Sequence, residues 1–185
     1  MRIGVFIGEV SGARTTVDEL LAAARDAEAR GFACGWVPHI PWSLDALTAL
    51  ALAGQVTARI ELGTAVVPTY PRHPLAMAHQ AMSTQAATSG RLVLGVGPSH
   101  PVVIEGMYGL PYDAPARHTR EYIEVLRAAF ACTGHVECVH RKVVVIPSAS
   151  NWVTFRAAWL QVIGPCESDI LIVVAKCPIL VKGPA

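Results

Sequence analysis

The stretch "LGTAVVPTYPRHPLAMAHQAMSTQAATSGRLVLGVGPS", from Leu62 to Ser99, contains a strand, a helix and a second strand. The apolar run at its start belongs to a strand that we predict over 60–67, and the run near its end predicts a strand over 91–97. Pro74 and Gly90 are typical of the beginning and the end of a helix. The seven residues from 68 to 74, where the strand passes into the helix, include three prolines, a tyrosine, an arginine and a histidine. A rigid polar loop therefore follows a buried strand directly.

The same alternation of strands and helices runs through the first 131 residues. Further strands are predicted over 2–8 and 32–40, and helices over 15–31, 44–58, 74–90 and 117–131. Thr16 and Glu19 have the spacing of a capping box, and Ser43 is a candidate N-cap. Strands that are apolar almost throughout indicate an α/β fold with a parallel sheet covered by helices. The sheet can be open and doubly wound or a (β/α)8 barrel, and no GxGxxG motif supports a dinucleotide fold.

Composition excludes several classes of protein. The chain has 185 residues, 52% hydrophobic and 16% charged, which is enough for one domain with a core and excludes disorder. A net charge of +1 gives no reason to expect a nucleic-acid or membrane partner. The apolar run at the N-terminus is too short for a signal peptide, so we expect a cytoplasmic protein. The five cysteines form no CxxC pair or zinc-like cluster, so we predict no metal site.

Polar and aromatic residues gather where the predicted strands end. In both possible sheets, ligands bind at the carboxyl ends of the strands. The segments concerned are "GEVSG" (8–12), "PHIPW" (38–42), "PTYPRHP" (68–74) and "GPSHP" (97–101). Their imidazoles titrate near neutral pH, and their arginine has a forked set of donors for a carboxylate or phosphate. We assign Trp42, Tyr70 and Arg72 to substrate binding, because the two rings can wall a flat molecule.

Most of these residues also have a purely structural interpretation. His39 can be a half-buried histidine that bonds a backbone carbonyl, and His73 can cap the helix that follows it. Arg72 can be a solvated loop charge. We expect His79 and His118 to lie on the surface. The functional interpretation is favoured because four consecutive strand ends carry polar groups while the strands carry almost none.

The motifs "GT-x-V", "P-T-x-x-R-H-P" and "SGR-L-x-LG-V-G" within this stretch resemble the luciferase-like monooxygenases of the bacterial-luciferase superfamily. The match looks closest to the members that use coenzyme F420, and it covers about residues 2–131. The resemblance implies a (β/α)8 TIM-barrel fold that holds a flavin or deazaflavin at the carboxyl ends of its strands. Only the N-terminal half of such a barrel is recognisable.

The resemblance also implies roles for individual residues. Ala65 and Val66 match the place where the family backs the cofactor ring with a bulge and an unusual peptide. His39 matches a histidine near the reactive face. His100 stands where some relatives carry an acidic proton donor, so the sequence departs from the family there; both histidines are candidate catalytic residues. The candidate cofactor-binding residues are Gly8, Ala65, Val66, Pro68, Gly97, Pro98 and Ser99.

The activity that the resemblance implies is hydride transfer between coenzyme F420 and a small organic substrate. FMN is the alternative cofactor, and it would make the protein a monooxygenase. Two alternatives remain outside this activity: a non-catalytic half-barrel that associates with other chains, and a doubly wound binding protein. Because members of the family are often dimers, a homodimer is one expected assembly.

Residues 132–185 differ from the rest of the chain. They contain four of the five cysteines and two valine- and isoleucine-rich runs, 142–147 and 169–176, with a candidate helix over 151–164 between them. A (β/α)8 barrel typically takes about 250 residues, so four more units do not fit. We therefore divide the chain into a half-barrel, 1–131, and an atypical tail, 132–185, with a frameshift or truncation as the leading explanation. A natural short form completed by a partner chain is the competing one, and truncation could leave the chain inactive.

Overall fold

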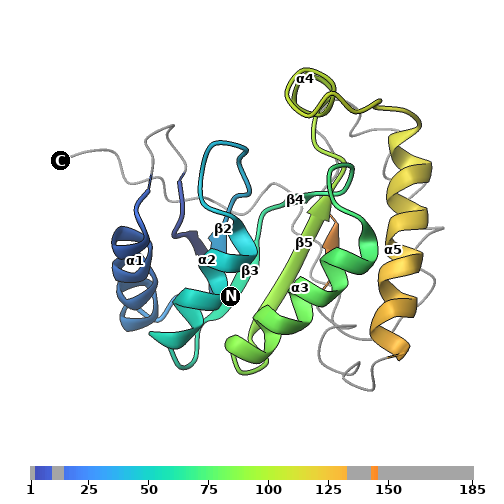
Figure 1. Ribbon diagram of the computed structural model, residues 1–185. Helices are drawn as coiled ribbons and strands as arrows, with labels where there is room; N and C mark the ends of the chain where they lie inside the picture. The colour runs from blue at the N-terminus through green and yellow to red at the C-terminus, as the bar shows by residue number, and fades with distance from the viewer. Residues whose placement is uncertain (1–2, 10–14, 133–142, 146–185) are drawn as a thin grey trace.

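A parallel sheet forms the centre of the computed structural model, which describes residues 3–9, 15–132 and 143–145 (Figure 1). Each pairing between its strands is parallel, and the order is β1-β2-β3-β5-β4, with β6 also paired to β5. The strands are β1 (Gly4–Phe6), β2 (Cys34–Val37), β3 (Glu61–Thr64), β4 (Val67–Pro68), β5 (Leu92–Gly97) and β6 (Val143–Val145).

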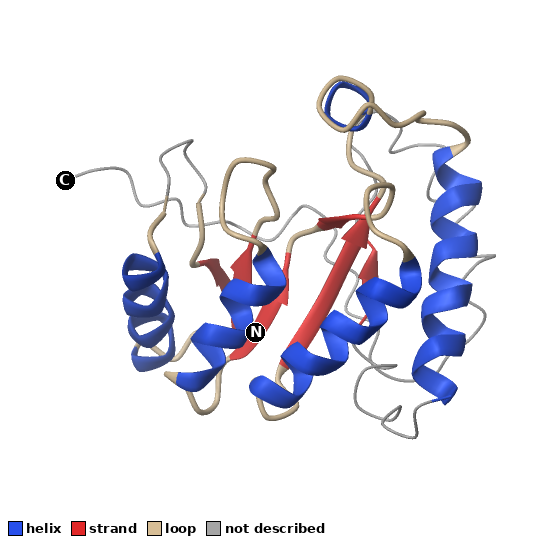
Figure 2. Cartoon of the chain, in the orientation of Figure 1, coloured by secondary structure: helices blue, strands red, loops and turns tan. Residues whose placement is uncertain are grey.

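Helices follow the sheet along one face (Figure 2). The helices are α1 (Val17–Ala29), α2 (Ala46–Gln55), α3 (Pro74–Ala87), α4 (Pro101–Ile104) and α5 (Pro115–Cys132). Neighbours in this row pack together: α1 on α2, α2 on α3, and α3 on α5. One apolar core lies between helices and sheet, and its largest fully buried side chains include Phe130, Leu50 and Met77. The four-residue helix α4 was not predicted, because so short an element has no periodicity to detect.

The order of the strands decides between the two predicted sheets. A doubly wound sheet reverses its strand order at a switch point. In the described residues, β1, β2 and β3 are successive neighbours, and β5 lies between the β3–β4 segment and β6, so order in space follows order along the chain. This is the arrangement of a (β/α)8 barrel and excludes the doubly wound sheet for this part of the chain.

Strand β6 lies within the segment that we separated as an atypical tail. Its residues Val143–Val145 pair in register with Leu94–Val96 of β5. The parallel sheet therefore continues past residue 131. The strand and helix predicted over 169–176 and 151–164 lie outside the described residues.

The helix caps confirm two predictions and correct a third. Thr16 and Glu19 form the predicted capping box, and His73 caps α3 by accepting the Leu75 N–H at 3.2 Å. Ser43 does not cap α2: Asp45 does, because its Oδ1 accepts the Thr48 N–H at 2.9 Å. Asp and Ser are equally favoured at this position, so the sequence alone could not separate them.

The strand predicted over 60–67 is interrupted. Gly63 pairs with Val93 and Val67 pairs with Val96, so three residues on one side face two on the other, which is a β-bulge. The peptide between Ala65 and Val66 is cis. The side chain of Thr64 replaces the missing ladder bonds: its Oγ1 accepts the Gly95 N–H at 2.7 Å and donates to the Gly95 carbonyl at 2.8 Å. A bulge and an unusual peptide are what the resemblance led us to expect here.

A tryptophan covers the face of the sheet opposite the helices. The indole of Trp36 lies over Gly4 and Gly63 on the two neighbouring strands. A Cβ atom would come within 2.5 Å of the indole at Gly4 and 2.4 Å at Gly63, closer than atoms can approach. Both positions therefore require glycine as long as Trp36 keeps this place. No helix among the described residues is long and apolar enough to cross a membrane.

The bulge generates a stability prediction. Replacing Thr64 with valine removes both bonds to Gly95 and leaves a buried N–H without its acceptor, so we expect the free energy of unfolding to decrease by about 2 kcal/mol. Urea unfolding followed by circular dichroism measures the change. Ser83→Ala, which removes an exposed hydroxyl on α3, is the control and should stay within about 0.5 kcal/mol of wild type. Equal losses in both variants would contradict this role of Thr64.

Candidate functional site

The predicted cofactor-binding residues lie along the carboxyl-terminal edge of the sheet. Ala65 and Val66 are half-buried, while Thr64 and Val67 on either side of them are buried. The segment that follows β5 is buried as far as Pro98, and Ser99 is half-buried with a φ angle of 64°. The bulge therefore exposes backbone and two small apolar side chains in part at this edge, whereas the segments on either side of it are buried.

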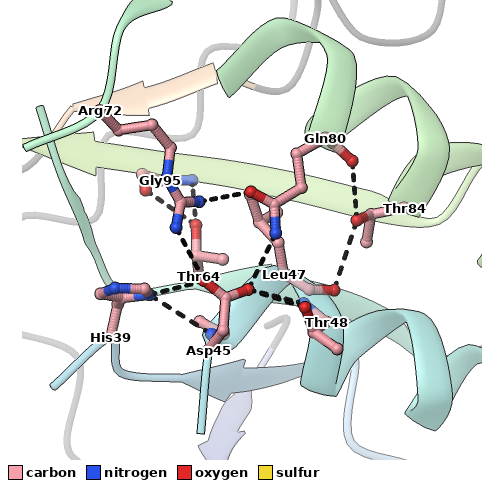
Figure 3. Close-up of polar contacts among 10 residues, drawn as sticks. His39, Asp45, Leu47, Thr48, Thr64, Arg72, Gln80, Thr84 and Gly95 are labelled. Carbon is pink, nitrogen blue, oxygen red and sulfur yellow. Dashed lines mark hydrogen bonds and ion pairs between the residues drawn. The ribbon is translucent and has the colours of Figure 1, made fainter. Parts of the chain in front are cut away.

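His39 follows β2 at the same edge, and its ring is held by the start of α2 (Figure 3). Its Nδ1 accepts the backbone N–H of Ala46 at 3.3 Å and lies 3.7 Å from Oδ2 of Asp45. The sequence analysis allowed for a bond from His39 to a backbone carbonyl. For Nδ1 this is wrong, because its partner is a backbone N–H group. Burial lowers the pKa of His39, the charge of Asp45 acts in the opposite direction, and the charge of Arg72 lowers it further.

Asp45 is the centre of a polar network that the sequence analysis did not find. Its Oδ1 accepts bonds from the Thr48 N–H at 2.9 Å, the Thr48 hydroxyl at 3.0 Å and Gln80 Nε2 at 2.9 Å. Its Oδ2 accepts a bond from Arg72 Nη2 at 2.8 Å. Burial raises the pKa of Asp45, but the bonds from Arg72 and Thr48 and the charge of Arg72 outweigh this effect, and the pKa is lowered. The one available signal was an acidic residue in the first turn of the helix predicted over 44–58.

Arg72 lies inside this network. Besides its ion pair with Asp45, its Nη1 donates to Gln80 Oε1 at 2.6 Å, and its carbonyl accepts the Tyr122 hydroxyl at 2.8 Å. Its side chain is 23% exposed, so a solvated loop charge is the wrong interpretation. Two of its nitrogens are bonded within the chain, and a role in substrate binding stays a prediction. The loop 68–74 is thus joined to α2, α3 and α5.

An aromatic cluster holds the other side of this loop. The rings of Tyr70 and His118 stack with centroids 3.9 Å apart, and Tyr112 lies 5.1 Å from Tyr70. His118 Nε2 is 3.1 Å from the Thr69 hydroxyl. Burial lowers the pKa of His118 and Glu121 opposes the shift. The prediction that His118 lies on the surface is wrong, because the first turns of α5 pass over the loop; His79 is exposed, as predicted.

The same cluster reaches the segment after β5. The Tyr112 hydroxyl donates to the Ser99 carbonyl at 3.0 Å, and the Tyr70 hydroxyl donates to the Asp113 carbonyl at 2.6 Å. Burial raises the pKa of Tyr70, so its phenol stays a donor at neutral pH. The segment 109–115 therefore holds the backbone of Ser99 in place through Tyr112.

Glu9 is a further candidate that the sequence analysis missed. It follows β1 at the carboxyl edge and is only 4% exposed, yet neither carboxylate oxygen has a hydrogen-bond partner among the described residues. Burying a carboxyl group without a hydrogen-bond partner costs free energy, so a hydrogen-bond donor from a ligand would stabilise it. An acid directly after Gly8 in "GEVSG" was the signal for it.

The structure separates the remaining predicted residues from these networks. His100 is exposed and precedes α4 without a capping bond from its side chain. Trp42 is 52% exposed, and Gly8 is half-buried after β1. Their roles stay predictions. Within the described residues, no three or more His, Cys, Asp or Glu side chains group closely enough to hold a metal ion.

The bulge, the ring of His39 and the loop 68–74 all lie at the carboxyl edge of the sheet, which is where proteins with a (β/α)8 barrel bind their ligands. The family described as luciferase-like monooxygenase matches residues 1–151, past residue 131 where we expected the resemblance to end. The chain therefore belongs to the luciferase-like monooxygenase family.

Individual proteins agree with this assignment. The Mycobacterium tuberculosis protein named "Putative coenzyme F420-dependent oxidoreductase Rv3520c" is 42% identical over 113 residues, which cover 61% of this chain and 31% of that protein. The coenzyme F420-dependent tetrahydromethanopterin reductase of Methanopyrus kandleri is similar in structure, with a TM-score of 0.60, 24% identity, and 70% and 40% of the two chains covered.

A structure with FMN is similar as well. It is the oxygenating constituent of the 3,6-diketocamphane monooxygenase of Pseudomonas putida, with a TM-score of 0.62, 16% identity, and 70% and 39% coverage. Proteins of this fold thus work with F420 or with FMN. The chain spans about a third of the length of the curated relative it matches and about 40% of the similar structures.

The half-buried positions of His39 and His118 lead to a pH prediction. Because burial lowers the pKa of both His39 and His118, the folded chain binds these protons less readily than the unfolded chain does. We expect full stability at pH 7.5 and a decrease in the free energy of unfolding as the pH falls below about 6.5, the usual histidine value. Urea titrations between pH 7.5 and 5.5 measure the decrease.

His118→Phe keeps an aromatic ring against Tyr70 but cannot be protonated. We expect the free energy of unfolding of this variant to decrease less steeply below pH 6.5 than that of wild type. In the double variant with His39→Gln, the decrease should be smaller still. A profile of His118→Phe as steep as that of wild type would show that this histidine does not cause the dependence.

Proposed function

We propose that the chain is part of an F420-dependent oxidoreductase that transfers a hydride between the deazaflavin and a small organic substrate. The observation that carries the proposal is the bulge between β3 and β4, which presents Ala65 and Val66 at the carboxyl edge of the sheet. The 42% identity to a protein with an F420-dependent name supports F420 over FMN.

The residues at this edge fit a flat ring. Ala65 and Val66 are small and apolar, so a ring can lie against the bulge without displacing a polar group. Gly97 ends the neighbouring strand β5 and pairs with Pro68, the last residue of β4, and Pro98 and Ser99 follow Gly97 directly. The two buried oxygens of Glu9 have no hydrogen-bond partner within the described part of the chain, which suits a ligand that brings N–H or O–H donors.

Bound F420 would supply the hydride donor or acceptor, because its deazaflavin ring carries the redox chemistry. The protein's part is to orient and to shield. Ala65 and Val66 would support one face of the ring, and the loop 68–74, fixed by Asp45 and Tyr122, would keep its wall in one position. His39 would lie at the reacting side, where burial keeps it neutral at physiological pH.

The remaining predicted residues have roles at the periphery of this site. Trp42 and Tyr70 would contact the substrate, and His100 would supply a polar group where relatives carry an acid. The activity of the whole protein is part of the proposal, because the later strands of the family's barrel, which hold the phosphate-bearing end of the cofactor, are not among the described residues. A half-barrel that associates with other chains is the competing proposal.

A titration with F420 tests the proposal. We expect saturable quenching of tryptophan fluorescence by F420, since Trp36 lies on the sheet and Trp42 follows β2. Ala65→Phe fills the place of the ring and should weaken binding at least tenfold, which corresponds to about 1.4 kcal/mol. Ala86→Phe, the same change at an exposed position near the other end of α3, is the matched control and should bind as wild type does.

The outcomes separate the alternatives. Tighter binding of FMN than of F420, with the same loss in Ala65→Phe, would replace the proposed cofactor and make a monooxygenase the better proposal. No binding of either by folded protein would contradict the proposal and favour the non-catalytic half-barrel. Equal affinity of Ala65→Phe and Ala86→Phe would place the ligand elsewhere.

A further inference from the structure

We propose that Asp45 and Arg72 are a pair of positioning residues that hold His39 as the neutral tautomer with its proton on Nε2. The ring then offers a hydrogen-bond donor, and not a proton acceptor, at the carboxyl edge of the sheet. The identity of the group that accepts this hydrogen bond rests on the proposed function. The assignment of the tautomer does not depend on it.

The backbone fixes the protonation of one ring nitrogen. The Ala46 N–H lies 3.3 Å from His39 Nδ1 with its hydrogen directed at that atom. A backbone N–H can only donate, so Nδ1 must carry a lone pair. The single proton of a neutral imidazole is then on Nε2.

Asp45 alone would favour the opposite state. Its Oδ2 lies 3.7 Å from Nδ1, and an uncompensated carboxylate at that distance attracts a proton to Nδ1 and makes the ring positive. Arg72 prevents this in two ways. Its Nη2 occupies the same oxygen at 2.8 Å, and its positive charge compensates the carboxylate.

The other oxygen of Asp45 is also occupied. Oδ1 accepts three bonds, from the N–H and hydroxyl of Thr48 and from Gln80 Nε2 (Figure 3). Gln80 in turn accepts a bond from Arg72 Nη1 at 2.6 Å, so the carboxylate, the guanidinium and the amide form a closed ring of bonds. The carboxylate cannot rotate toward His39 without breaking bonds to α2 or α3.

Within the described part of the chain, two charged side chains act on His39. Asp45 at the start of α2 and Arg72 of the loop 68–74 are the two charges that act on it. From α3, the amide of Gln80 contacts Asp45 and Arg72 and is neutral. From α5, Tyr122 bonds the Arg72 carbonyl, and burial raises the pKa of its phenol, so it also stays neutral.

This tautomer has a chemical consequence. An Nε2–H group stabilises negative charge that develops on a nearby oxygen, and it does so without giving up its proton. It cannot act as a general base through Nε2, because that atom has no lone pair to offer. The group that faces His39 should therefore be a hydrogen-bond acceptor, such as a carbonyl oxygen of the substrate.

Histidine side-chain NMR on the full chain without cofactor tests the proposal. In a ¹H–¹⁵N spectrum at pH 7.5, we expect His39 to have an unprotonated Nδ1 and a protonated Nε2; His39→Gln identifies its signals. Arg72→Met should raise the proton affinity of His39 about tenfold, a pKa increase of about one unit, because Asp45 loses its compensating charge. Arg72→Lys, which keeps the charge, should restore most of the wild-type value.

Two variants complete the test. Arg117→Met removes a charge from the exposed side of α5 and should leave His39 unchanged. Asp45→Asn keeps an oxygen that can cap α2 but removes the negative charge, so it should lower the proton affinity of His39. This variant decides the question if Arg72→Met does not fold.

The proposal is overturned if Nδ1 carries the proton in the wild type, if Arg72→Met and Arg117→Met have the same effect, or if Asp45→Asn does not lower the affinity. The result is independent of F420 binding. A chain that binds F420 but has the other tautomer would disprove this inference alone. A chain with the expected tautomer that binds no cofactor would disprove the proposed function alone.

Discussion

The ion pair between Asp45 and Arg72 is the interaction on which the arrangement of the site depends. One carboxylate caps α2, receives the guanidinium of the loop 68–74 and receives the amide of Gln80 on α3. An exposed ion pair of this kind contributes little, but here both partners are half-buried and each makes further bonds, so removing either one leaves a half-buried charge without its counter-charge. This contact fixes the side of the loop that faces α2 and α3, while Tyr122 and the stacked pair of Tyr70 and His118 hold it from α5.

The order and type of the larger elements could be predicted from the sequence, because they follow from local patterns. Apolar runs gave the strands, and Pro74, Gly90 and the Thr16–Glu19 capping box gave helix ends that agree with the structure within a few residues. The motif after the third predicted strand led to the family, which the match to residues 1–151 confirms. These signals are short-range, and each one depends on residues that are neighbours along the chain.

The networks of the site could not be predicted in the same way. In the sequence, Asp45 looks like an ordinary acidic residue near the start of a helix. Its hydrogen bonds, however, extend to Gln80, which is 35 residues away. His118 read as a surface residue on an amphipathic helix, yet its ring stacks on Tyr70, 48 positions earlier in the chain. Such contacts depend on how whole elements pack, and no periodicity records them. Glu9 was missed for a different reason: a lone acid after a strand is common, and this one is notable only because it is buried with no partner among residues 3–9, 15–132 and 143–145.

The hydrogen bond from Tyr122 to the Arg72 carbonyl spans 50 residues and has a consequence for how the protein folds. Closing a loop of that length costs entropy before the contact forms, so such contacts form late unless a core already holds the two segments near each other. The strands up to β5 can assemble from nearer contacts, whereas the loop 68–74 acquires its final shape only when α5 docks on α3. When the ribosome has released the chain only as far as α4, the strands up to β5 can therefore be paired while the loop 68–74 still lacks its final shape.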